Sequence, residues 1–180
     1  LAEIQVGGDP RSIAVAPDGR LWIANKRSAT ISIIDPASFS VVQTVTLARG
    51  SRPHGLAFSP AGAVGFVVLE ATGELLKLDP STGGVLGSVA VGPWPRHVAV
   101  TSDGSTVYVS RFISPPVAGE SGASPSTTTG GGEIVEVDPV AMAVSRTLIL
   151  QQSTEPDSGG GGRGVPNYLG AMAISPDGSA

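Results

Sequence analysis

The chain has 180 residues, and its 11 Lys and Arg against 15 Asp and Glu give a formal net charge of −4 at pH 7. This mild acidity argues against a nucleic-acid-binding protein, which usually carries a basic patch or stripe. The 25 Gly and 15 Pro disfavour long helices, whereas the 41% of hydrophobic residues suffice for a packed core. The lack of Cys excludes disulfides, thiolate metal sites, cysteine nucleophiles and covalent haem attachment within these residues.

One pattern recurs four times along the chain, an apolar stretch followed by a turn of the Pro-Asp-Gly type. The turns centre on Asp18, Ala61, Asp103 and Asp177, at steps of 43, 42 and 74 residues. A second marker, the dipeptide Asp-Pro, recurs at 35–36, 79–80 and 138–139. Two independent markers with one spacing predict an internal repeat.

Each repeat is predicted to hold four short strands rich in Val, Ile and Leu. In chain order they are 13–16, 21–24, 31–34 and 41–47; 56–59, 65–69, 75–78 and 85–91; 98–101, 107–110, 134–137 and 144–150; and 172–175. Four-stranded units of about 40 residues are typical of β-propeller blades. We therefore expect an all-β chain, a partial β-propeller with units at about 9–51, 52–93 and 94–166 and the start of another at 167–180.

The ends of the second strands carry a family resemblance. They read Trp22-Ile23-Ala24-Asn25, Phe66-Val67-Val68-Leu69 and Tyr108-Val109-Ser110-Arg111. These units resemble the YVTN-type β-propeller repeat, whose second strand typically ends Tyr-Val-Thr-Asn. The resemblance implies a bacterial exported protein of the periplasm or cell surface. Because both chain ends fall within a repeat, we expect a piece of a longer propeller that is marginally stable or self-associating alone.

Two insertions interrupt the third unit, at about 113–132 and 151–166. Asp138 follows Arg111 by 27 residues, whereas Asp35 follows Asn25 by 10. In an antiparallel meander, both insertions and the starts of the first strands emerge on one face, which we call the insertion face. Long loops on a rigid scaffold often carry function. The alternative is that their Ser, Thr and Gly tracts are spacers.

Arg11, His54 and Arg96 hold the same position in successive repeats, just before the first strand. We expect them to surround the mouth of the central channel, where they could bind an anion. Alternatively, they could hydrogen-bond to neighbouring blades. Six further residues are candidates for the rim of this site: Arg52, Trp94, Arg111, Arg163, Asn167 and Tyr168.

Signals for catalysis and metal binding are weak. His54 and His97 occupy repeat positions that differ by one residue, which predicts side chains on opposite sides of the inner strand. No metal site is therefore expected. The recurring Asp residues belong to turns, and Glu70 has no carboxylate partner that the sequence can identify. Trp22 is predicted to lie in the core. We expect no catalytic residue, no metal and no cofactor in this part of the protein.

Three functions remain open from the sequence. The first is a non-enzymatic scaffold that binds an unknown protein or a small anionic ligand on the insertion face, completed by further blades of the same chain. The second is the propeller module of a bacterial redox protein, because 111–117 and 164–170 resemble propellers that accompany haem-c peroxidase-like domains. Any haem would then lie outside these residues. The third is a lactonase-like hydrolase, which a ring of basic rather than acidic residues disfavours.

Overall fold

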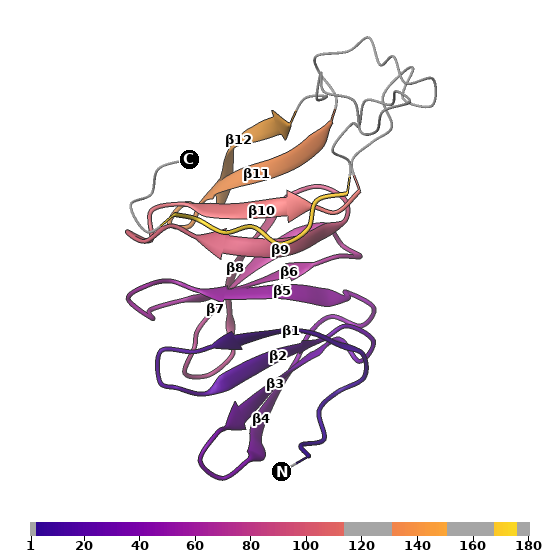
Figure 1. Ribbon diagram of the computed structural model, residues 1–180, viewed down its shortest axis with the longest axis vertical. Coiled ribbons are helices and arrows are strands. Elements are labelled where there is room, and N and C mark those ends of the chain that lie inside the picture. The colour runs from indigo at the N-terminus through magenta and orange to yellow at the C-terminus, as the bar shows by residue number, and fades with distance from the viewer. Residues whose placement is uncertain (1–2, 114–130, 151–167, 176–180) are drawn as a thin grey trace, which may run out of the picture.

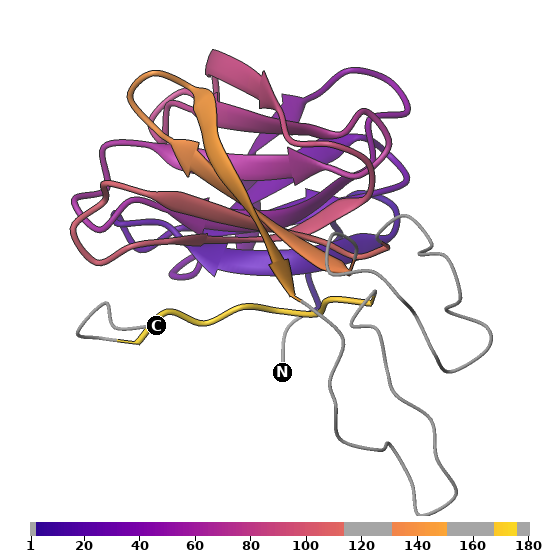
Figure 2. The same cartoon turned by 90° about the horizontal axis from the view of Figure 1, so that it is seen from above.

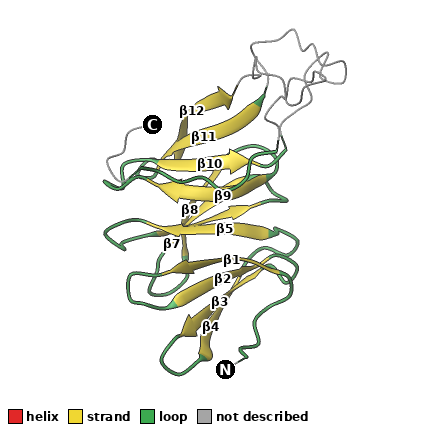
Figure 3. Ribbon diagram, in the orientation of Figure 1, coloured by secondary structure: helices red, strands yellow, loops and turns green. Residues whose placement is uncertain are grey.

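The computed structural model describes residues 3–113, 131–150 and 168–175. All regular structure in these ranges is β-strand, arranged in three four-stranded sheets that fan out side by side (Figures 1 and 3). Blade 1 consists of β1 (Pro10–Val15), β2 (Leu21–Asn25), β3 (Thr30–Asp35) and β4 (Ser40–Thr46). Blade 2 consists of β5 (Pro53–Phe58), β6 (Gly65–Leu69), β7 (Glu74–Leu78) and β8 (Val85–Ala90). Blade 3 consists of β9 (Pro95–Val100), β10 (Val107–Arg111), β11 (Gly132–Asp138) and β12 (Ala143–Leu150).

Every blade is an antiparallel meander in which each strand pairs with the next one in the chain. The first strands β1, β5 and β9 lie next to one another through the middle of the molecule (Figure 1). The chain is thus an all-β protein built from blades of a β-propeller. This confirms the predicted fold class.

The first strands begin three residues earlier than predicted, at Pro10, Pro53 and Pro95. Proline is compatible with the first position of a strand because its missing N–H is not needed for the ladder there. Residues 172–175, predicted as a strand, are not assigned as one in the structure. Just before them, Ser110 Oγ of blade 3 donates a hydrogen bond of 3.1 Å to the Gly170 carbonyl.

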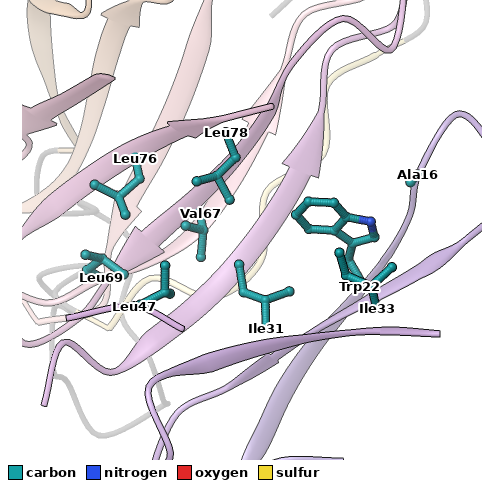
Figure 4. Packing of buried hydrophobic residues seen from close by; sticks show 9 residues of the cluster. All are labelled: Ala16, Trp22, Ile31, Ile33, Leu47, Val67, Leu69, Leu76 and Leu78. Atoms are coloured by element: carbon teal, nitrogen blue, oxygen red, sulfur yellow. The ribbon is translucent and has the colours of Figure 1, made fainter. Parts of the chain in front are cut away.

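The core lies between blades rather than within one. Trp22, Ile31 and Ile33 of blade 1 pack against Val67 and Leu78 of blade 2 (Figure 4). A second cluster joins the other face of blade 2 to blade 3. Middle strands such as β6 are buried on both faces and are therefore apolar without a break, whereas the outer strand β4 alternates. Trp22 is fully buried, as predicted.

The recurring Asp residues act within turns. Asp35 accepts a hydrogen bond from the Ala37 amide at 2.9 Å, and Asp79 accepts one from the Ser81 amide at 2.7 Å. For Asp35 the Ala37 amide, and for Asp79 the Ser81 side chain, is the main group that holds the carboxyl pKa below its usual value. No helix in the described residues is long and apolar enough to cross a membrane.

Candidate functional site

The insertion face collects the starts of first strands and the ends of second and fourth strands. In blade 3, Arg111 pairs with Pro95 and Gly132 pairs with Leu150. Both insertions are therefore attached at this one face, on the right in Figure 1, and Figure 2 shows the same strand ends from above. The insertions themselves, with the candidates Arg163 and Asn167, lie outside the described residues.

A carboxylate at the centre of this face joins three blades. Glu70, directly after β6, forms ion pairs with Lys26, directly after β2, and with Arg96 of β9, whose Nε lies 2.5 Å from Glu70 Oε1. The Glu70 side chain is only 1% exposed. Burial alone would raise the pKa of Glu70, but hydrogen bonds from Lys26 and Arg96 outweigh it and hold that pKa below its usual value. The three charges fix the relative positions of the blade ends.

An aromatic row continues from this ion cluster toward the start of the next repeat. The Arg96 guanidinium lies 3.4 Å from the centroid of the Phe112 ring, a cation–π contact. Phe112 in turn makes an edge contact with exposed Tyr168, at 5.5 Å between centroids. Arg96 thus takes part in fixed contacts on both sides of its guanidinium.

The two histidines meet, which the sequence did not predict. The His54 and His97 rings are 5.5 Å apart, edge to face, and His54 Nδ1 lies 3.0 Å from the Arg96 carbonyl oxygen. The prediction treated alternation along the inner strand, but the two histidines lie on neighbouring strands, β5 and β9, so alternation does not keep their rings apart. Gly55 allows this approach, since a Cβ there would lie 2.5 Å from the same carbonyl. Burial lowers the pKa of His54 to about 4.

The predicted row of basic residues is brought together in part. His54 and Arg96 are neighbours, whereas Arg11 forms an exposed ion pair with Asp9 at 3.0 Å. Arg11 also lines a separate, mostly apolar hollow, together with Ile13. A common mouth for all three therefore stays a prediction.

The rim candidates differ in their surroundings. Arg111 is buried, where its guanidinium pairs with Glu133 and donates to the Pro93 carbonyl at 3.0 Å. Arg52 and Trp94 are exposed and flank one open pocket of about 580 Å³. The remaining residues that line this pocket are Glu70, Ala71, Thr72, Gly73, Ala90, Gly92 and Pro93.

Arg52 and Trp94 also share an unusual backbone conformation. Their φ angles are 56° and 59°, and Asp9, at the same repeat position, has a φ of 60°. Each of the three precedes a proline, and its carbonyl accepts the amide that follows the second strand, as Trp94 accepts Phe112 at 2.8 Å. Left-handed φ costs a non-glycine residue about 1 to 3 kcal/mol. The repeat thus imposes the conformation, while the side chain that occupies it differs between blades.

Sequence reasoning missed the Lys26–Glu70–Arg96 cluster. Lys26, Glu70 and Phe112 are equivalent positions, each directly after a second strand, and this alignment of opposite charges was the available signal. Within the described ranges, no group of three or more His, Cys, Asp or Glu side chains could hold a metal ion.

Three blades with inner strands around one axis define the class of fold, the β-propeller. Solved structures agree: the chain is similar to hydrazine synthase of Kuenenia stuttgartiensis (TM-score 0.71, 20% identity, 99% of this chain and 42% of that one). It is similar also to virginiamycin B lyase of Staphylococcus aureus (TM-score 0.60, 12% identity, 81% and 43%) and to a protein of Lactobacillus plantarum (TM-score 0.58, 19% identity, 78% and 41%). At these identities the likeness concerns the fold.

Sequence comparison gives a short match. The chain is 40% identical over 52 residues to the PE-PGRS family protein PE_PGRS18 of Mycobacterium tuberculosis, a match that covers 29% of this chain and 11% of that protein. No family model matches the chain. The chain spans less than half of each solved structure that it resembles.

Proposed function

We propose that the chain is the non-enzymatic binding module of a bacterial exported protein of the YVTN type, and that the insertion face holds its anionic ligand or acidic partner. The repeat pattern and the partial match to a mycobacterial protein support the bacterial assignment. Export is tested by fractionating a bacterial host that expresses the natural full-length gene. Recovery of the protein in the cytoplasm alone would contradict it.

One observation carries the binding role. The insertion face fixes Lys26 and Arg96 in ion pairs across blades and Arg111 in an ion pair within blade 3, yet leaves Arg52 and Trp94 exposed beside a pocket. Glu70, the one acid among the residues that line this pocket, is already paired with two cations and is no free general base. A rigid surface with uncommitted recognition side chains favours binding over catalysis. The redox and lactonase functions stay alternative predictions.

The test is an NMR titration of the whole chain, ¹⁵N-labelled, with citrate against sodium chloride of equal ionic strength. We expect citrate-specific amide shifts at Arg52, Thr72 and Trp94. Absent shifts, or shifts at the opposite face around Asp35 and Asp79, would refute the proposal.

Arg11→Ala tests the predicted row separately. Its partner Asp9 is exposed, so the variant should keep the fold, whereas Arg96→Ala would also remove a counter-charge from Glu70. If the row of Arg11, His54 and Arg96 binds the anion, Arg11→Ala should bind citrate more weakly. Unchanged binding would limit the site to the pocket.

A further inference from the structure

Among the described residues that line the pocket on the insertion face, Arg52 is the one cation without a recorded partner. Arg52 is exposed, and the structure records no hydrogen bond or ion pair for its guanidinium within the described residues. The other cations near the pocket have carboxylate partners: Lys26 and Arg96 share Glu70, and Arg111 pairs with Glu133. Arg52 is therefore the side chain that can form a new pair with a carboxylate, by two parallel hydrogen bonds.

The surroundings of the pocket are positive although the chain is acidic. Lys26, Arg96 and Glu70 together carry one net positive charge, and Arg111 with Glu133 is neutral. With Arg52 added, the local charge is positive, against −4 for the whole chain. Such a local field attracts an anion and disfavours a cation.

Part of the pocket lining is apolar. Trp94 is 42% exposed, and Ala71, Ala90 and Pro93 also line the pocket. Within the described ranges the structure records no ring contact for Trp94. An aromatic face left open in this way can pack against the ring of a ligand. The pocket volume of about 580 Å³ is within the range of small-molecule sites.

The backbone at Arg52 and Trp94 limits which residues fit these two positions without strain. Arg52 and Trp94 both occupy left-handed φ positions, where Gly or Asn would be less strained. The repeat imposes this conformation, and the Arg52 carbonyl accepts the Glu70 amide at 3.0 Å. Within the described residues, no recorded contact of the Arg52 guanidinium explains why an arginine occupies the position.

We propose that this pocket binds a small carboxylate that carries a ring, with the carboxylate on Arg52 and the ring against Trp94. The inference rests on the proposed function, because it names the ligand class of the same face. A sugar acid and an aromatic acid share this chemistry, and the two are distinguished by the probes below.

The experiment follows tryptophan emission of the whole chain during titration. The chain has two tryptophans, and Trp22 is fully buried, so a change on binding reports Trp94. The probes are D-glucuronate and benzoate, each compared with its neutral counterpart, D-glucose or benzyl alcohol. We expect saturable binding of at least one acid, at least tenfold tighter than its neutral counterpart.

Arg52→Asn should weaken binding of that acid at least tenfold. Because Asn adopts left-handed φ more readily, the same variant should unfold at equal or higher urea concentration than the wild type. Arg49→Asn is the matched control, since Arg49 is exposed, precedes Arg52 by three residues and does not line the pocket. It should alter binding less than twofold.

Each contrary result overturns the inference. These are no saturable change with either acid, equal affinity for acid and neutral counterpart, or equal losses in Arg52→Asn and Arg49→Asn. If citrate perturbs the insertion face while both acids fail to bind, the ligand class is wrong and the binding role stands. If neither citrate nor the two acids bind at the insertion face, both the ligand class and the proposed binding function are wrong.

Discussion

Protonation of His54 should destabilise the protein under mildly acidic conditions. Burial lowers the His54 pKa from its ordinary 6.5 to about 4, against the opposing effect of Glu70; the charges of His97, Arg96 and Lys26 lower it further. Between these two values the unfolded chain binds more protons at this residue than the folded chain. The free energy of unfolding therefore rises with pH from about 4 to 6.5 and is constant above that range as far as His54 is concerned.

The magnitude follows from the shift. One pKa unit corresponds to about 1.4 kcal/mol, so the full shift would give about 3 kcal/mol. Because the His54 ring is only partly buried, water screens part of this effect, and about 2 kcal/mol is a better expectation. His97 should add to the change in the same direction, since burial lowers its pKa too.

The assay is urea unfolding of the wild type and of His54→Asn at a series of pH values from 4 to 8. The Asn amide can donate to the Arg96 carbonyl in place of neutral His54 Nδ1, so the variant retains the contact without titrating. The difference in unfolding free energy, wild type minus variant, should be about 2 kcal/mol larger at pH 7.5 than at pH 4. A difference that is flat across this range, or that falls with pH, would refute the reasoning.

Three further predictions concern stability and association. Glu70→Gln should cost about 3 kcal/mol of unfolding free energy in urea at pH 7, because two cations lose their partner. Glu136→Gln loses a partly exposed pair with Arg146 and should cost less than about 1 kcal/mol in the same assay. Equal losses would contradict this. Asn25→Ala should cost about 2 kcal/mol in urea unfolding, since the buried amide donates to Thr30 and Ser32 at 3.2 and 2.9 Å; a loss below about 0.5 kcal/mol would contradict it. Ile13 and Val15 of β1 are 60% and 67% exposed, so changing both to Thr should reduce self-association measured by sedimentation velocity. Unchanged association would show that these two side chains do not drive it.

The repeat and its blades could be predicted from sequence because their causes are local. Apolar strands and turn residues recur at one spacing, and Asp35 and Asp79 make in the structure the turn contacts that their sequence context indicates. The burial of Trp22 likewise follows from its place in an apolar second strand. The early start of the first strands at Pro10 was missed because strand limits depend on the pairing partner, here Asn25.

The sequence by itself determined the all-β blade architecture and placed the attachment points of both insertions on one face, because strand alternation and turn chemistry act over a few residues. Only the tertiary structure decided which side chains on that face are free. Arg96 meets Glu70, 26 residues away, and His54 meets His97 across two blades. Such contacts depend on the orientation of each blade relative to the next. That orientation is set by packing of the core between blades rather than by local sequence. The same packing left Arg52 and Trp94 beside an open pocket.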